Sequence, residues 1–146
     1  MREILFRGKR KDNGKWIEGG YCFYNNKSYI IIATQYIPDT RDWDTAIYYE
    51  ENPVYKPTFI EVYPKTVGQY TNKMDKNRTK IFEGDVIAYD NRYSYVVQWD
   101  DERCGFYAKM REFDDYDYFG NFRTKLSEVI GNIYDNPELL NNKRRQ

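Results

Sequence analysis

The chain has 146 residues and balances 23 Lys and Arg against 23 Asp and Glu, so its net charge is zero. A neutral chain has no global field that would draw it to DNA or to a membrane, and the absence of histidine removes the commonest general base and metal ligand. Valine, isoleucine, threonine and aromatic residues, including 16 tyrosines, are abundant, and because these side chains favour strands we predict an all-β (mainly β) fold.

The first predicted elements form a β-meander over about residues 1–63. Asp-Asn-Gly at 12–14 predicts one turn and Asn25-Asn26 predicts another, because these residues tolerate a positive φ. Between and after these turns, apolar and β-branched residues predict strands over residues 2–7, 16–24, 28–33 and 58–63.

A proline-rich and acidic excursion interrupts this meander between residues 38 and 57. It contains three prolines and one short apolar run, Ile47 to Tyr49. Proline removes a backbone donor from a strand, so we predict a long loop with at most a short edge strand at that run. A loop of this length in a compact domain commonly has a function.

The second half predicts an SH3-like, partly open barrel element over about residues 66–134. Its polar segment "NKMDKNRTK", residues 72–80, predicts a loop. In the strand expected at 93–99, Tyr93, Tyr95, Val97 and Trp99 share one face and Ser94, Val96 and Gln98 share the other, a period of two that is typical of a half-buried strand. The predicted strands lie at residues 66–70, 85–89, 93–99, 104–110 and 128–134.

The triplet Glu83-Gly84-Asp85 has two interpretations. As a structural corner, Gly84 supplies an unusual φ/ψ before an apolar strand, and the two acids face water or cap backbone amides. As a site, Glu83 and Asp85 would form an acid/base pair, but the sequence offers no second base or carboxylate cluster that would define their roles. The corner is the preferred interpretation, and a carboxylate-dependent enzyme is a distant alternative.

The chain is predicted to end in one short helix over about residues 137–142. Asn136 is the expected N-cap, Pro137 suits the first helical position, and Glu138 is favourable near the positive end of the helix. The whole chain, residues 1–146, is expected to form a single domain.

The search for catalytic and metal-binding patterns predicts no catalytic residues, no metal site and no cofactor. Asp115, Asp117 and Gly120 have the spacing of a calcium loop, but Phe119 and Leu126 stand where oxygen ligands are required. Two isolated cysteines, Cys22 and Cys104, suit reduced and packed thiols.

Nucleic-acid binding is the main alternative to a protein-binding role. Tyrosine-rich β surfaces stack bases when basic side chains neutralise phosphates, although aromatic residues with a period of two more often belong to a core. The candidate residues are Tyr93, Tyr95, Trp99, Lys73, Lys76, Arg78 and Lys80.

Membrane contact is not expected. No apolar stretch approaches the roughly 18 residues of a membrane-spanning helix, and no charged segment followed by an apolar one opens the chain. We therefore expect a cytoplasmic protein.

Three stretches together resemble the YopX family of phage and prophage proteins. They are "MREILFRGKRKDNGKWIEG", "TVGQYTNKMDKNRTKIFEGDVI" and "EVIGNIYDNPELL". The resemblance implies a mostly β, homo-oligomeric protein of a phage or prophage, located in the bacterial host cell and without an established biochemical activity. The family usually has Gly after "QYT" and an Asn-Gly turn after "DK", whereas this chain has Asn72 and Arg78 at those places.

These observations lead to one functional hypothesis. Basic and acidic residues cluster in separate segments of a neutral chain, so unlike patches on two copies can meet without net repulsion. We predict a non-enzymatic, homo-oligomeric binding or assembly module, with nucleic acid or another protein as a further possible partner and no membrane.

Overall fold

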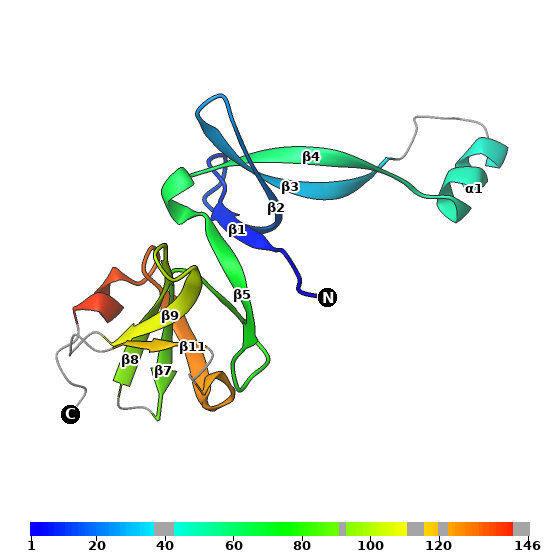
Figure 1. Cartoon of the computed structure of the whole chain (residues 1–146). Coiled ribbons are helices and arrows are strands. Elements are labelled where there is room, and N and C mark those ends of the chain that lie inside the picture. Colours follow the sequence, from blue (N-terminus) through cyan, green and yellow to red (C-terminus); the bar gives the residue numbers. More distant parts are fainter. Residues whose placement is uncertain (37–42, 91–92, 111–115, 120–122, 142–146) are drawn as a thin grey trace.

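The computed structural model describes residues 1–36, 43–90, 93–110, 116–119 and 123–141. Within these residues the strands form two antiparallel sheets, and neither sheet closes into a barrel (Figure 1). The prediction of a mainly β fold is therefore confirmed.

The first sheet has six strands in the order β4-β3-β2-β1-β5-β6. Asn25 and Asn26 both have positive φ and close the predicted tight turn between β2 and β3. Strand β5 joins this sheet because it pairs with β1, with Arg7 opposite Gly68. The strands are β1 (Phe6–Lys9), β2 (Trp16–Tyr24), β3 (Lys27–Tyr36), β4 (Val54–Val62), β5 (Gly68–Met74) and β6 (Lys80–Phe82).

Two strand boundaries differ from prediction: β5 continues because it pairs with β6 as far as Met74, and β1 begins late beside an asparagine that binds the N-terminal segment. Strand β1 begins at Phe6 and not at residue 2, and β5 continues into the segment predicted to be a loop. The Asn72 amide oxygen accepts a hydrogen bond from the Glu3 backbone N–H, and its Nδ2 donates to the Glu3 carbonyl, each at 2.9 Å. The Asn72 side chain therefore bonds the Glu3 N–H and carbonyl, which would pair with a neighbouring strand if β1 began earlier.

Strands β3 and β4 form a long hairpin whose inner part belongs to the sheet, because Lys27 to Ile31 of β3 pair with β2, and whose outer part extends away from the rest of the molecule (Figure 1). Its far end carries helix α1 (Trp43–Glu51), so the predicted edge strand at Ile47 to Tyr49 is wrong. Pro53 ends a helix here, as prolines do one or two residues beyond a C-terminus, and Asn52 donates to the Tyr48 carbonyl at the last turn. We call β3, α1 and β4 the arm.

The second sheet has five strands in the order β10-β9-β8-β7-β11. Strand β8 forms where the alternation predicted it, but the predicted half-buried pattern is wrong, because Val96 (7% exposed) and Val97 (fully buried) are both buried at the centre although they belong to opposite faces, and Tyr93 and Trp99 at the two ends are each 39% exposed. The strands are β7 (Asp85–Tyr89), β8 (Tyr93–Asp100), β9 (Gly105–Met110), β10 (Tyr116–Tyr118) and β11 (Ser127–Asn132). The core consists of Ile81, Ile87, Val97, Ala108 and Phe119.

Three short 3-10 helices complete the fold: η1 (Pro64–Thr66), η2 (Thr124–Leu126) and η3 (Pro137–Leu140). The predicted C-terminal helix is η3, but Asn136 does not cap it with its side chain. Instead the Asn136 Oδ1 accepts a hydrogen bond from the Asn132 N–H at 3.3 Å. Gly131 makes this possible, because a Cβ there would lie 2.4 Å from that oxygen.

The two cysteines are unpaired thiols. Cys22 is half-buried, but Cys104 is exposed in the turn between β8 and β9, so the prediction that both are packed is wrong for Cys104. No helix in the described ranges has the length and apolar character that crossing a membrane requires.

Candidate functional site

The Glu83-Gly84-Asp85 segment forms the corner between β6 and β7. Gly84 has a φ of +86°, a left-handed conformation that glycine adopts without strain. Its N–H donates to the Val97 carbonyl and its carbonyl accepts from the Ile133 N–H, both at 2.9 Å. The corner is thus hydrogen-bonded to β8 on one side and to the C-terminal segment on the other.

Asp85 connects this corner to the first sheet. Its side chain is 1% exposed, its Oδ1 lies 2.6 Å from Nη2 of Arg7, and its Oδ2 accepts a hydrogen bond from the Phe82 N–H at 2.7 Å. Burial raises the pKa of the Asp85 carboxyl, and the charge of Arg7 opposes that rise. Asp85 is therefore a buried anchor between the sheets and does not face water.

The guanidinium of Arg7 lies between two aromatic rings. Its Cζ is 4.7 Å from the centre of the Trp16 ring and 4.8 Å from that of Phe82. Aromatic faces attract cations, so Trp16 and Phe82 support the guanidinium that Asp85 binds, and the Glu83 carbonyl accepts a further hydrogen bond from Arg7 Nη2 at 3.4 Å. The guanidinium site beside Asp85 is therefore occupied by the protein's own arginine.

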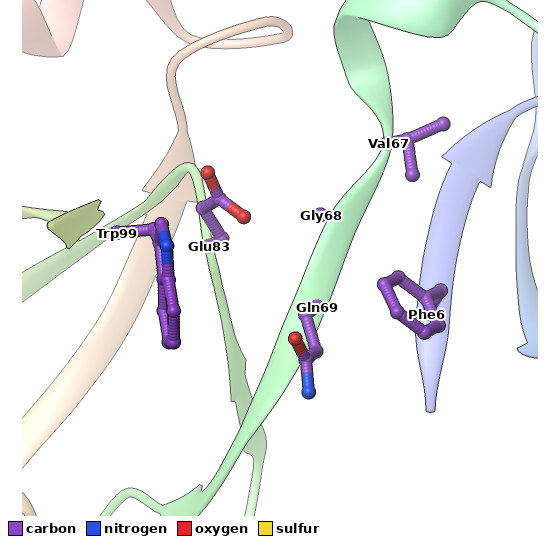
Figure 2. A pocket seen from close by; sticks show the side chains of 6 residues that line it. All are labelled: Phe6, Val67, Gly68, Gln69, Glu83 and Trp99. Carbon is purple, nitrogen blue, oxygen red and sulfur yellow. The ribbon is translucent and has the colours of Figure 1, made fainter. Parts of the chain in front are cut away.

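Glu83 lies on the other side of Gly84 and lines an open pocket of about 200 Å³. The pocket lies between β5 and β1 on one side and the corner and β8 on the other, and Figure 2 shows the Glu83 carboxylate directed toward Gly68. A Cβ at Gly68 would lie 2.6 Å from the Glu83 carbonyl oxygen, so glycine permits this close approach. The lining residues are Phe6, Val67, Gly68, Gln69, Glu83 and Trp99.

The carboxyl of Glu83 is held in an unfavourable environment for a charge. Burial raises its pKa, a backbone hydrogen bond from Gln69 opposes the rise, and the negative charge of Asp101 adds to it. None of the ion pairs formed within the described ranges includes Glu83. Among the residues that the structure describes, the Glu83 carboxyl group is therefore partly buried and has no ion-pair partner, while its backbone carbonyl accepts a hydrogen bond from Arg7 at 3.4 Å.

The two carboxyl groups of the corner do not share one environment. Asp85 is bonded to Arg7 and to backbone, whereas Glu83 faces the pocket. An acid/base pair needs both groups to reach one reacting molecule, and Asp85 is too enclosed to take that part.

The structure distributes the predicted nucleic-acid residues among different environments. Trp99 lines the pocket, Tyr93 is exposed at the far end of β8, and Tyr95 packs against the core. Lys76 pairs with Glu128 at 2.6 Å and Lys80 pairs with Glu18 at 2.9 Å, while Lys73 and Arg78 are exposed. Nucleic-acid binding by these residues stays a prediction, and a mobility shift with single- and double-stranded DNA and RNA at low salt tests it.

The calcium-like segment falls partly outside the described residues, because Asp115 and Gly120 are not among them. Phe119, at the position where a loop of this type needs an oxygen ligand, is buried in the core of the second sheet. Within the described ranges no group of three or more Cys, Asp and Glu side chains could hold a metal ion.

Sequence reasoning missed one polar cluster. Asp135 accepts hydrogen bonds from Nε1 of Trp16 at 2.6 Å and from Nζ of Lys9, and these interactions join the C-terminal turn to the first sheet. Lys9 lowers the pKa of Asp135 to about 2. The only sequence signal was that charged residues stand at both ends of the chain, and this does not identify a partner.

The fold and the site together define a class of mainly β protein. Two antiparallel sheets meet at the Glu83-Gly84-Asp85 corner, and beside this corner lies a pocket lined by aromatic residues and the Glu83 carboxylate. The family model described as YopX protein matches residues 5–141, and the chain belongs to this family. The chain is also similar to protein EF1440 from Enterococcus faecalis, a crystal structure, with a TM-score of 0.57 and 21% sequence identity over 96% of this chain and 99% of that chain. This likeness shows a shared fold. No curated protein matches the chain.

Proposed function

We propose that this protein is a non-enzymatic binding or assembly module that acts as a homo-oligomer. The observation that carries the proposal is the arm, which exposes a large apolar surface. Helix α1 has no buried residue, and the first six residues of β4 are all exposed. The exposed fractions of the largest apolar side chains are 80% for Trp43, 60% for Tyr48, 58% for Tyr55, 55% for Phe59 and 47% for Ile47.

An isolated two-stranded hairpin is only marginally stable in water, because it cannot bury enough apolar area to offset its ordering. Within the arm the tip is held by contacts among aromatic rings, such as the edge-to-face pair of Tyr36 and Tyr49 at 6.4 Å. Large apolar side chains that are exposed together on one projecting element are typical of interaction sites in soluble proteins. The arm is thus suited to pack against another molecule.

A second copy of the chain is the partner that we favour. Strand β4 is an edge strand of the first sheet, and its outer backbone groups before Glu61 can pair with a neighbour, whereas Glu61 and Val62 already pair with Lys11 and Arg10. The chain has no net charge, so copies do not repel one another over distance. The sequence resemblance to phage and prophage proteins supports the same oligomeric role, in the cytoplasm of a bacterial host.

Light scattering after size exclusion tests this proposal. Tyr36 and Val54 are directly paired, so residues 37–53 can be replaced by an Asn-Gly turn that closes a shorter hairpin. We expect the intact protein to be an oligomer and the shortened protein to be a monomer. A matched control replaces Asn25-Asn26 by Asn-Gly and should leave the oligomer intact. A monomeric intact protein contradicts the proposal, and an oligomer that survives shortening removes the role of helix α1.

A further inference from the structure

We propose that the pocket beside Glu83 is a recognition site for a guanidinium group, as carried by an arginine side chain. This proposal is independent of the oligomeric role of the arm, because none of the pocket's lining residues belongs to the arm.

The chemistry of the pocket is that of a cation site. Glu83 supplies a carboxylate, and Trp99 and Phe6 supply aromatic rings. In Figure 2 the indole of Trp99 is seen nearly edge-on, with a face turned toward the side of the pocket where Gln69 and Phe6 lie. A carboxylate accepts the N–H groups of a guanidinium in a fork, and an aromatic face attracts the same planar cation. The Gln69 side chain adds an amide oxygen that can accept a further hydrogen bond.

The molecule contains an internal model for this recognition. Arg7 binds Asp85 at 2.6 Å while its guanidinium lies within 5 Å of two aromatic ring centres, at 4.7 and 4.8 Å. Glu83 stands two residues before Asp85, on the opposite side of Gly84, and lines a pocket together with the aromatic residues Phe6 and Trp99, and its carboxylate forms no ion pair with a residue in the described part of the chain. The site at Asp85 is occupied by Arg7 of the chain itself, and the pocket at Glu83 has residues suited to binding the guanidinium of another molecule.

The size and energetics of the pocket agree with a side chain as the ligand. A volume of about 200 Å³ is below the roughly 300–1,000 Å³ of pockets that take drug-sized molecules. Burial destabilises the charged form of an unpaired Glu83 carboxyl group, so a cation that pairs with it offsets part of the free energy of desolvation. Guanidinium is preferred to ammonium because it is planar and less strongly hydrated, and so stacks on Trp99 more readily.

The test is a titration of the isotope-labelled full-length protein, followed by the NMR signal of the Trp99 indole N–H, which a Trp99→Phe variant assigns. The probes are N-acetyl-arginine methylamide, free L-arginine and N-acetyl-citrulline methylamide, whose urea group has the shape of guanidinium without its charge. We expect saturable shifts with the two arginine compounds and none with the citrulline compound. Tighter binding of the capped compound identifies a polypeptide side chain as the source, and tighter binding of free arginine identifies the amino acid.

Two variants complete the experiment. Glu83→Gln keeps the shape of the side chain and should weaken binding about tenfold, because the charge-assisted hydrogen bonds are lost. Glu61→Gln makes the same charge change on the first sheet, where Glu61 pairs with Lys11, and should leave binding unchanged. Equal shifts with arginine and citrulline, an unaltered affinity in Glu83→Gln, or the absence of any saturable shift would each overturn the proposal. Backbone amide spectra of both variants establish that they are folded.

Discussion

Arg7 and Asp85, which are 78 positions apart in the chain, form an ion pair at 2.6 Å that joins β1 of the first sheet to β7 of the second. Both side chains are largely removed from water, with exposed fractions of 13% and 1%. A charge that is buried with a partner becomes costly when the partner is removed. The two sheets are therefore held together by a contact that is sensitive to single substitutions.

We predict that Arg7→Met destabilises the protein by about 3–5 kcal/mol at neutral pH, because it leaves the Asp85 carboxylate buried and unpaired. Chemical denaturation measures this loss. Burial already raises the pKa of Asp85 and Arg7 opposes that rise, so the carboxyl should take up a proton more readily in the variant, and the loss should shrink as the pH is lowered. The double variant Arg7→Met/Asp85→Asn should be less destabilised than the sum of its single variants, and strict additivity would contradict this account.

Gly84→Ala is expected to destabilise by about 1–3 kcal/mol because the position has a left-handed backbone. A Cβ would also lie 3.0 Å from Cε2 of Tyr134. Two controls separate these causes in thermal melts. Gly14 has a positive φ and open space where a Cβ would lie, so Gly14→Ala should show the backbone strain alone. At Gly20 an added Cβ would have its nearest neighbour at 3.8 Å, so Gly20→Ala should change stability little. An equal effect at Gly84 and Gly20 would contradict the prediction.

Arg78→Gly should stabilise the protein by about 0.5–1 kcal/mol. Arg78 has a φ of +64°, which costs an ordinary side chain energy and costs glycine little. Asn72 also has a positive φ, but Asn72→Gly should bring no gain, because it removes both hydrogen bonds to Glu3. Urea denaturation of the two variants checks the contrast.

Asp135→Asn should lower stability by about 1 kcal/mol at neutral pH, a modest value because the side chain is 33% exposed and solvent screens the pair. The folded-state pKa of Asp135 is lowered from 3.8 to about 2, chiefly by Lys9. An acid whose pKa is lower in the folded state stabilises the fold at pH values above its unfolded-state pKa of 3.8. That stabilisation is lost as the pH falls from 3.8 toward 2. The difference between the two proteins should therefore narrow across that interval in denaturation curves, and a difference that is constant with pH would argue against the ion pair.

Local chemistry in the sequence was sufficient for the strands and turns that depend on neighbouring residues. The alternation in 93–99 predicted β8, and the asparagines at 25 and 26 predicted the turn between β2 and β3, because a pleated strand and a turn with positive φ impose their demands on consecutive residues. Helix α1 was missed for a related reason. The prolines of residues 38–57 favour a loop along the whole segment, but the helix lies between them and Pro53 marks only its end.

The relationships that define the site depended on tertiary structure. Nothing near Arg7 in the sequence indicates that β1 lies beside β5, and yet this pairing brings Arg7 to Asp85 and Phe6 to the pocket of Glu83 and Trp99. The sequence by itself determined the corner at Gly84, because a left-handed residue before a strand is a local requirement. Only the packing of the two sheets decided that Asp85 is paired with Arg7 while Glu83 is partly buried beside the pocket. Burial and charge pairing depend on groups that are distant along the chain.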